Sequence, residues 1–374
     1  MLVRSLENTI QSRFLQQKVS LLIGARRVGK TELLQKIRDT SDQKILWLNG
    51  EDADVEKILE NRTVANYQNL LQGYDILMID EAQYIPDIGR KLKLMIDEIK
   101  PLHIVATGSS ALDISQSGEP LVGRTFTYYL YPLAQMELKQ TENILQTKQL
   151  LEDRLIYGSY PELVFIKTHE EKKRYLQELV NTYLLKDILA FERVQNPQKL
   201  KDLLGLIAMQ IGSEVSLDEL GKNLQMSKNT VERYLDLLSK VFIIYQRKGF
   251  SKNLRKEIAK SNRWYFYDNG IRNYLIGNMQ ALALRQDVGM LWENYFLSER
   301  IKVNGYNEKH IESYFWRTYD QQEIDLIEVE NNQLKAFECK WKLHKHKIPV
   351  AFAKAYPDAQ FEIIHQDNYL DWIE

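Results

Sequence analysis

The sequence predicts an α/β protein that begins with a parallel β-sheet covered by helices. Three observations support this fold class. A glycine-rich turn at residues 24–31 follows an apolar run and precedes a helix-like pattern. Apolar, β-branched runs alternate with helical stretches, as they do in parallel sheets; these runs lie near residues 19–24, 44–49, 75–80 and 103–108. Polar residues follow the runs, which predicts a ligand site at the carboxyl edge of the sheet.

The composition is that of a soluble globular chain with room for two or three domains. Of the 374 residues, 44% are hydrophobic and 27% are charged. The net charge of −1 excludes polyanion binding by the whole surface, so any nucleic-acid surface must be local. Cys339 is the only cysteine, which excludes an internal disulfide and favours a reducing, cytoplasmic compartment. No apolar run approaches the ~20 residues of a membrane span, so we expect no membrane partner.

The stretch "GARRVGKT" fits the pattern G-x-x-x-x-G-K-[ST]. Its glycines let backbone N–H groups turn toward phosphate oxygens, and the following helix adds the positive end of its dipole. We predict that Lys30 contacts the β- and γ-phosphates of ATP and that the Thr31 hydroxyl ligates Mg²⁺. The predicted nucleotide-binding residues are Gly24, Ala25, Arg26, Arg27, Val28, Gly29, Lys30 and Thr31.

The stretch "YDILMIDEAQ" predicts a buried strand that ends in two acidic residues. A strand of this kind is the expected partner of the glycine-rich turn. We predict that Asp80 holds the Mg²⁺ shell and that Glu81 orients and polarises the attacking water. Without the upstream lysine, a buried strand that ends in a solvated acidic turn would be the simpler interpretation.

Two further positions are candidates for contacts with the γ-phosphate. The run "HIVATGSSA" predicts a core strand that ends in hydroxyl residues; Ser109 is our choice as a sensor of the γ-phosphate or the water, with Ser110 and Thr107 as alternatives. Arg124 follows a glycine and could complete charge stabilisation at the γ-phosphate, in cis or across a subunit contact. The alternative is that Arg124 is an ordinary surface residue.

The motifs occur in an order that resembles a known family. They are "GARRVGKT", "LNGED", "MIDEAQ", "TGSSA", "VGRTFTYYLYPL" and "YGSYPELV". The set resembles a prokaryotic family of AAA-type P-loop ATPases that carry a domain of unknown function at the carboxyl end, and the resemblance covers nearly the whole chain. It implies an ATPase core over residues 1–135 that binds ATP and hydrolyses it, but it implies no single cellular task.

A helical connector over residues 136–197 and a winged helix-turn-helix over residues 198–270 are predicted next. The second unit reads as three helices followed by two strands, with Ser216 and Ser227 as helix caps. A basic segment follows the third helix, and it either grips nucleic-acid phosphates or belongs to a module that packs on the ATPase and regulates it. The candidate nucleic-acid contacts are Lys228, Asn229, Arg233, Arg247, Lys248, Lys252 and Arg255.

Residues 271–374 are predicted to form a domain with the order helix, three strands, helix and strand. This order is similar to the PD-(D/E)XK nuclease core, whose chemistry needs carboxylates around a divalent metal and a lysine beside the attacking water. The candidates are Glu293 on an amphipathic helix, Asp325 on the second strand, and Glu338 and Lys340 on the third. The sequence "EID" lacks the proline of that motif, and such folds also serve as binding scaffolds without cleavage.

Three functions remain open from the sequence. The first is an Mg²⁺-dependent ATPase that drives or switches the carboxyl-terminal module, which could act on DNA or other nucleic acid. The second is a slow, nucleotide-gated switch that recruits a protein partner. The third is a metal-dependent DNA nuclease under ATP control. An oligomer is compatible with all three, because AAA-type relatives often form rings.

Overall fold

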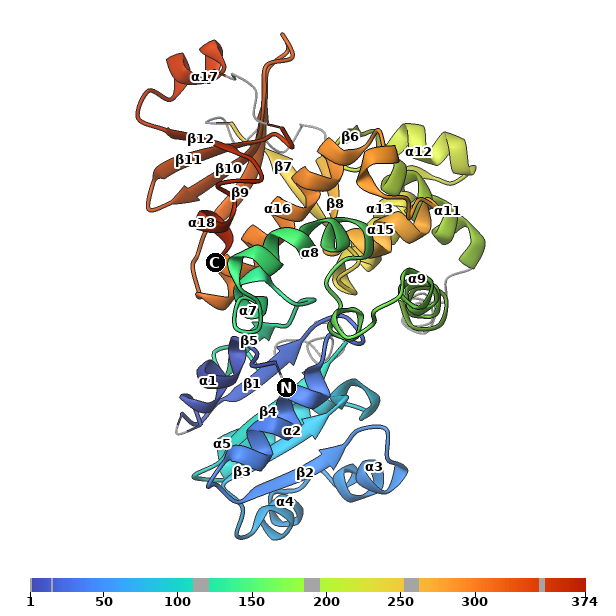
Figure 1. Cartoon of the computed structure of the whole chain (residues 1–374). Coiled ribbons are helices and arrows are strands. Elements are labelled where there is room, and N and C mark those ends of the chain that lie inside the picture. Colours follow the sequence, from blue (N-terminus) through green and yellow to red (C-terminus); the bar gives the residue numbers. More distant parts are fainter. Residues whose placement is uncertain (1, 15, 110–120, 185–195, 252–261, 343–346) are drawn as a thin grey trace. The chain divides into compact units, whose positions relative to one another are not determined.

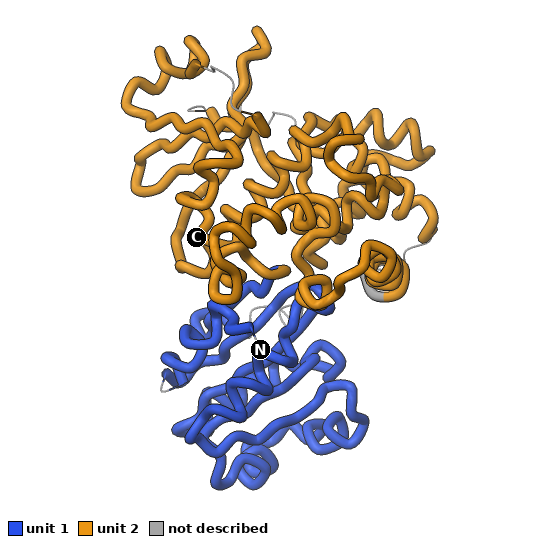
Figure 2. The backbone as a smooth tube through the Cα atoms, viewed as in Figure 1, with its two compact units in different colours: residues 1–131 blue, residues 132–374 orange. Residues whose placement is uncertain are grey.

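The chain divides into two compact units, residues 1–131 and residues 132–374 (Figure 2). The computed structural model describes residues 2–14, 16–109, 121–184, 196–251, 262–342 and 347–374. Among these residues, every helix is too short or too polar to cross a membrane.

Unit 1 alternates strands with helices (Figure 1). Its elements are α1 (Leu6–Gln11), β1 (Val19–Ile23), α2 (Lys30–Thr40), β2 (Ile45–Asn49), α3 (Ala53–Glu60), α4 (Val64–Leu71), β3 (Ile76–Asp80), the 3₁₀ turn η1 (Ala82–Tyr84), α5 (Ile88–Glu98), β4 (His103–Gly108) and β5 (Thr125–Tyr129). Helix α2 packs against β3, α5 packs against β4, and α4 packs against α5. The predicted α/β class and its helix-covered parallel sheet are confirmed.

The five strands of unit 1 form one parallel sheet in the order β2-β3-β4-β1-β5. The residues of β1, β3 and β4 are all buried, as expected for parallel strands covered on both faces. All five carboxyl ends lie at the same edge, so the segments that follow β1, β2, β3 and β4 meet there. The four predicted strands match this sheet, whereas β5 was not predicted.

A buried histidine lies at the amino edge of this sheet. His103 begins β4, and its Nδ1 lies 2.8 Å from the Gln16 carbonyl while its Nε2 lies 3.1 Å from the Ser20 hydroxyl. A carbonyl only accepts hydrogen bonds, so Nδ1 carries the proton and Nε2 accepts from Ser20. Burial lowers the pKa of His103, and the folded protein therefore keeps this imidazole neutral.

Unit 2 begins with helices that correspond to the predicted connector. They are α7 (Gln135–Leu138), α8 (Ile144–Tyr157), the 3₁₀ turn η2 (Pro161–Val164), α9 (His169–Glu178) and the π-helical segment η3 (Leu179–Leu184). Helix α8 starts at an Asn143 capping box and ends at Gly158, whose φ of 81° suits glycine. Gly158 thus ends α8, and Pro161 begins η2.

The remainder of unit 2 contains the predicted helices and strands together with a short strand before the second helix and several helices that were not predicted (Figure 1). Its elements are α11 (Pro197–Met209), β6 (Glu214–Val215), α12 (Leu217–Leu224), α13 (Lys228–Lys240), β7 (Ile244–Gly249), β8 (Asn262–Phe266), α15 (Asn269–Leu275), η4 (Leu282–Leu284), α16 (Val288–Tyr306), β9 (Glu312–Arg317), β10 (Glu323–Glu330), β11 (Gln333–Cys339), α17 (Val350–Ala355), β12 (Gln360–Ile364) and α18 (Leu370–Ile373). The Ser216 hydroxyl caps α12 and the Ser227 hydroxyl caps α13, both as expected.

One seven-stranded sheet runs through unit 2 in the order β12-β11-β10-β9-β7-β8-β6. The hairpin of β7 and β8 is antiparallel, and β7 also pairs in parallel with β9, where Lys248 is opposite Tyr314 and Gly249 is opposite Phe315. The predicted boundary at residue 270 therefore falls inside a continuous sheet. The strands of residues 198–270 and those of residues 271–374 share one hydrogen-bonded sheet.

Helix α16 is buried on nearly all sides, so the predicted amphipathic character is wrong. It packs against β8, β11, α8 and α18. Several of its charged residues are buried in ion pairs: Arg300 binds Glu328 of β10, and Lys302 lies 2.7 Å from Glu299. A buried charge needs a partner of opposite sign, and here the pairs permit charged residues in the core.

Candidate functional site

The glycine-rich turn of unit 1 forms a loop between β1 and α2. Gly29 caps α2 with a φ of 94°, and Arg27 adopts a φ of 63°, so the backbone curls through two left-handed residues. A Cβ on Gly24 would lie 2.1 Å from the Leu130 carbonyl oxygen, which excludes any other residue there. Gly29 is therefore required by its backbone conformation, and Gly24 by the lack of space for a side chain.

Lys30 is buried inside this loop. Its ammonium donates to the carbonyl oxygens of Gly24 at 2.9 Å and Ala25 at 3.0 Å. Two backbone carbonyl oxygens thus bind the Lys30 ammonium. A charged phosphate would attract this ammonium more strongly than they do. Lys30 begins the 11-residue helix α2, so the positive dipole end lies at the loop. The arrangement fits the phosphates of a nucleotide.

Three side chains connect the loop to the neighbouring strands. The Thr31 hydroxyl donates to Asp80 Oδ2 at 2.7 Å, and the Thr107 hydroxyl donates to Asp80 Oδ1 at 2.6 Å. Each carboxylate oxygen of Asp80 therefore has a hydroxyl partner, one from α2 and one from β4. Hydroxyl and carboxylate oxygens are the hard ligands that Mg²⁺ prefers. Thr31 and Asp80, the two predicted Mg²⁺ ligands, thus lie within hydrogen-bond distance of each other.

Glu81 occupies a left-handed turn directly after β3, with φ 50° and ψ 46°. Its backbone N–H donates to the Thr107 hydroxyl at 2.8 Å, and its side chain accepts from Gln83 at 2.5 Å. Gly50, after β2, lies against this turn: its N–H donates to the Asp80 carbonyl at 2.8 Å, and a Cβ on Gly50 would lie 2.3 Å from the Glu81 carbonyl oxygen. The glycine of "LNGED" is thus the residue that lets the acidic turn approach β2.

The two predicted γ-phosphate contacts have different positions. Ser109 is buried just past the end of β4, at the carboxyl edge. Thr107, the alternative, is the hydroxyl that contacts Asp80 and Glu81. Ser110 lies outside the described residues.

Arg124 lies at the other end of the sheet. It precedes β5, whose Thr125 is opposite Val19 at the start of β1, and its guanidinium binds Asp97 at 2.6 Å. The five residues of β1 separate this edge from the loop by roughly 16 Å. The prediction that Arg124 reaches the γ-phosphate in cis is wrong, because β5 runs parallel to β1 and starts at the opposite edge.

Two residues near the loop make contacts that were not predicted from the sequence: Arg26 was predicted only as part of the loop, and Arg4 was not identified. Arg26 donates to the Tyr84 hydroxyl at 2.6 Å, which connects the loop to η1. Arg4, before α1, donates to the Val28 carbonyl at 2.6 Å and to the Tyr131 carbonyl at 2.7 Å. Arg4 precedes the loop by 20 residues and matches no motif, so no local pattern indicated it.

The four nuclease-like candidates of unit 2 come together at the seven-stranded sheet. Lys340 binds Glu338 at 2.7 Å, and the Cys339 N–H donates to Asp325 Oδ2 at 2.8 Å. Glu293 of α16 accepts from the Tyr265 hydroxyl at 2.6 Å. Burial, and then the charge of Asp325, raises the pKa of Glu293; burial, and then the charge of Glu338, raises the pKa of Asp325.

This cluster does not form a ready metal centre. Across the described part of the chain, no group of three or more His, Cys, Asp or Glu side chains has an arrangement that could hold a metal ion. The predicted catalytic role of these residues stays a prediction.

The candidate nucleic-acid contacts divide into two groups. Lys228, Asn229 and Arg233 are exposed on α13, and Lys228 binds Asp218 of α12 at 3.1 Å. Lys248 is exposed on β7, and Lys252 and Arg255 lie outside the described residues.

Arg247 is 4% exposed, so the prediction that it grips a phosphate backbone is wrong for this conformation. It lies directly opposite Arg263 in the β7–β8 hairpin, and its guanidinium is over the Tyr245 ring, with the charge centre 5.5 Å from the ring centroid. Arg263 is also buried, where it binds Glu323 at 2.7 Å and lies over Phe315. Both arginines therefore lie on the covered side of the hairpin and not on a surface open to nucleic acid.

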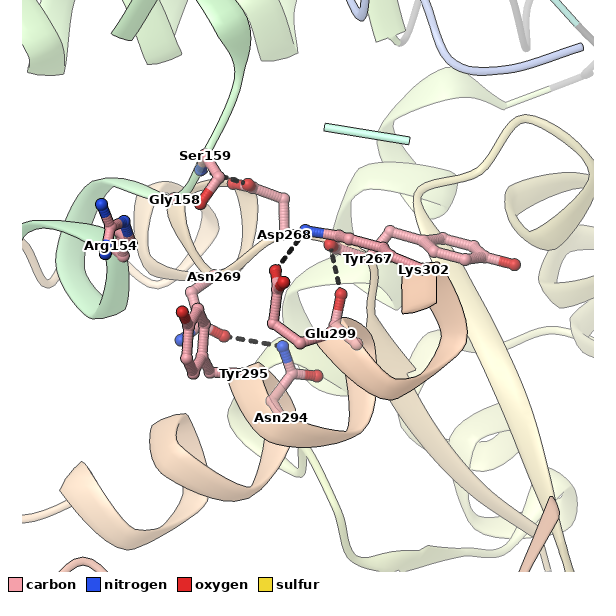
Figure 3. Close-up of a pocket in the computed structure, with 11 residues that line it drawn as sticks. Arg154, Gly158, Ser159, Tyr267, Asp268, Asn269, Asn294, Tyr295, Glu299 and Lys302 are labelled. Atoms are coloured by element: carbon pink, nitrogen blue, oxygen red, sulfur yellow. Dashed lines mark hydrogen bonds and ion pairs between the residues drawn. The ribbon is translucent and has the colours of Figure 1, made fainter. Parts of the chain in front are cut away.

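A small polar cavity lies elsewhere in unit 2, between α8, α15 and α16 (Figure 3). Its volume of about 10 Å³ gives room for about one water molecule. Asp268 accepts from the Ser159 N–H at 2.7 Å and from the Gly270 N–H at 2.9 Å, and burial raises its pKa. A Cβ on Gly158 would lie 1.9 Å from Asp268 Oδ1. The cavity belongs to a buried structural network and is too small for an organic ligand.

Three family matches cover most of the chain. Residues 16–139 match a family described as an AAA domain. Residues 148–282 match a domain of unknown function, DUF8612, and residues 288–368 match a second one, DUF4143.

Relatives and a solved structure agree with this division. An uncharacterized protein of Mycobacterium tuberculosis is 25% identical over 328 residues, covering 86% of this chain and 70% of its own. An uncharacterized protein of Haemophilus influenzae is 26% identical over 296 residues, covering 70% of each. The Walker-type ATPase of Pyrococcus abyssi shares the fold at 15% identity, with a TM-score of 0.51 over 74% of this chain and 96% of that one. The amino-terminal part of this chain therefore matches an AAA domain and has the fold of a Walker-type ATPase, and the regions that follow match two domains of unknown function.

Proposed function

We propose that the protein binds ATP with Mg²⁺ at the loop of residues 24–31, hydrolyses it, and couples the nucleotide state to unit 2. The proposal rests on the hydrogen bonds of the Thr31 and Thr107 hydroxyls with the two carboxylate oxygens of Asp80. Thr31 directly follows the buried Lys30 in α2. A lysine, a hydroxyl and a carboxylate meet where three parallel strands end. This is the set that phosphoryl transfer requires.

The chain's own residues divide the work of binding. Backbone N–H groups of the loop and the start of α2 would surround the phosphates, and Lys30 would exchange two backbone carbonyls for phosphate oxygens. Thr31 and Asp80 would hold Mg²⁺, which neutralises charge on the phosphates when bound.

Glu81 is the candidate for orienting the attacking water. Its backbone is fixed by the Thr107 hydroxyl, and its carboxylate is held by Gln83. The left-handed conformation of Glu81 is costly for a non-glycine residue, which is a common feature of catalytic turns. Ser109 is a second polar group at the same edge.

The test separates binding from turnover. We expect Lys30→Ala to lose at least about a hundredfold in nucleotide affinity or turnover, because it removes the buried cation. We expect Glu81→Gln to bind ATP normally and to turn over slowly. Lys248→Ala is the control, since this exposed lysine lies in unit 2. Full ATP turnover by the Lys30→Ala protein would remove the proposal.

A nucleic-acid role of unit 2 is supported by the exposed basic residues of α13. We propose that Lys228, Asn229 and Arg233 would contact phosphates or bases in a groove. Stimulation of ATP turnover by DNA or RNA, reduced in an Arg233→Ala variant, supports this role. Tight retention of nucleotide with no stimulation supports instead the slow switch that recruits a protein.

Cleavage of nucleic acid is the third function, and the assembly of the four polar residues at β10, β11 and α16 is the observation that favours it. The described residues are not arranged to hold a metal ion, so cleavage would require Asp325 and Glu338 to rearrange before they could bind one, with Lys340 beside the water. The measurement is nicking of DNA in Mg²⁺ or Mn²⁺, which must disappear in Asp325→Ala. Absence of nicking on single- and double-stranded substrates would contradict it.

A further inference from the structure

The first residues of unit 2 are held by buried polar groups. The Leu133 N–H donates to the Ser159 carbonyl at 2.8 Å, and Lys302 of α16 donates to the Leu133 carbonyl at 3.2 Å. The Gln135 N–H donates to Glu299 Oε2 at 2.7 Å. Because Glu299 and Lys302 also bind each other in the core, the segment 132–135 cannot shift without disturbing α16.

The last residues of unit 1 lie against the start of the phosphate loop, at Ile23 and Gly24. After β5, the Leu130 N–H donates to the Ile23 carbonyl at 2.7 Å, and the Leu130 carbonyl fills the space that a Gly24 side chain would need. Tyr131 follows, and the chain then passes directly into Pro132, the first residue of unit 2. A displacement of the loop at Gly24 would therefore press on the segment that leads into unit 2.

Arg4 connects the same two parts of unit 1. It is 8% exposed, and its two terminal nitrogens reach the Val28 carbonyl of the loop and the Tyr131 carbonyl at the end of the unit. Planar guanidinium nitrogens hold two acceptors in a fixed geometry, which a lysine does not reproduce.

The bond to Val28 also orients the loop toward its ligand. In a trans peptide, the carbonyl of Val28 and the N–H of Gly29 point in opposite directions. Arg4 binds the Val28 carbonyl, so the Gly29 N–H of the same peptide points away from the Arg4 guanidinium. An N–H of this kind, next to the start of α2, is a donor for a phosphate oxygen.

We propose that Arg4 is a positioning residue that orients the phosphate loop and transmits its nucleotide-bound arrangement through Tyr131 to residues 132–135. This inference rests on the proposed nucleotide binding. Nucleotide binding draws Lys30 away from the Gly24 and Ala25 carbonyls, and the loop then rearranges beside Leu130. Because Arg4 binds the Val28 and Tyr131 carbonyls, it carries that change to Tyr131, the residue after Leu130.

The test combines calorimetry with hydrogen exchange on the full-length protein. The probe is ADP with Mg²⁺. We expect Arg4→Met to weaken ADP affinity roughly tenfold, since charge-assisted hydrogen bonds to the loop are lost. In the wild-type protein, ADP should change the exchange rates of the Leu133 and Gln135 amides, and in Arg4→Met this change should be absent. Arg4→Lys should give an intermediate affinity.

Arg13→Met is the matched control. Arg13 comes from the same amino-terminal segment, donates to the Tyr128 hydroxyl at 2.9 Å and lies over the Phe126 ring. Its loss removes these contacts with β5 and not the bonds to Val28 and Tyr131, so ADP affinity and the exchange response should stay at wild-type levels.

The outcomes separate this inference from the proposed function. Wild-type protein that releases no heat with ADP contradicts nucleotide binding itself. Wild-type protein that binds ADP while Arg4→Met binds it equally well contradicts only the role of Arg4. Unchanged exchange at Leu133 and Gln135 in nucleotide-bound wild-type protein contradicts the transmission.

Discussion

Replacing Gly50 by alanine tests whether the acidic turn after β3 must be held in place. The new Cβ would lie 2.3 Å from the Glu81 carbonyl oxygen and 3.2 Å from the Asp80 carbonyl oxygen. Both are backbone atoms, so no flexible side chain can move aside. The turn must retreat by about 1 Å to reach ordinary van der Waals contact. That displacement carries Glu81 away from its position.

The size of the effect follows from this displacement. A misplacement of about 1 Å costs roughly a hundredfold in rate, or about 2.7 kcal/mol of transition-state stabilisation. Overpacking should also lower the free energy of unfolding of unit 1 by about 1–3 kcal/mol. Nucleotide affinity should change little, because Gly50 contacts β3 and its turn, not the loop of residues 24–31.

The assay is single-turnover ATP hydrolysis with ATP in excess of its dissociation constant, measured beside nucleotide affinity. Gly205→Ala in α11 is the control, because a Cβ there meets no atom within 4 Å. If Gly50→Ala hydrolyses ATP at the wild-type rate, the acidic turn does not depend on this contact and the catalytic assignment of Glu81 loses its geometric support.

Three more outcomes are expected. Thr107→Val removes the hydroxyl between Asp80 and Glu81, so turnover should fall at least tenfold and unfolding should become easier by about 1–3 kcal/mol, as measured by denaturation. Arg124→Ala should leave the turnover of isolated monomers unchanged, and a large loss there would contradict its placement at the far edge. His103 has a lowered pKa, so the unfolded chain binds a proton first as pH falls below about 6.5. Stability should be full above that pH and decline below it by up to about 1.4 kcal/mol per pH unit. Exchange of buried β4 amides measures this slope, and His103→Gln should remove it.

The phosphate loop was predictable because its chemistry is local. Eight consecutive residues specify the turn, the lysine and the hydroxyl, and the flanking strand and helix have clear periodicity. Asp80 was predictable for the same reason, as the end of a buried apolar run. Its neighbour Thr107 was named only as an alternative, because a sequence does not show which of several hydroxyls on β4 is opposite β3.

Arg124 was misplaced because β5 was not recognised. The run "TFTYY" alternates only weakly, and its direction relative to β1 depends on a connection that crosses the sheet. Once β5 is parallel to β1, every residue just before it lies at the amino edge. The prediction failed because the direction of β5 was not known, and not because an arginine is unsuited to contact a γ-phosphate.

Arg247 was misplaced because charge suggests exposure. Along β7, burial alternates after Tyr245, so Gln246 and Lys248 face solvent and Arg247 faces the covered side. Arg247 lies over the Tyr245 ring and opposite Arg263 on β8. These groups come together only in the folded chain. The charges of α16 misled in the same way, since the partner of Arg300 is 28 residues away on β10.

The continuous sheet of unit 2 limits which fragments of this protein can be expressed by themselves. A fragment that ends at residue 270 would lose β9 and leave the edge of β7 with unpaired N–H and carbonyl groups. Exposed edges of this kind pair with other chains, so such a fragment should aggregate on expression. The smallest piece of the carboxyl-terminal part that remains soluble should therefore keep residues 132–374 together.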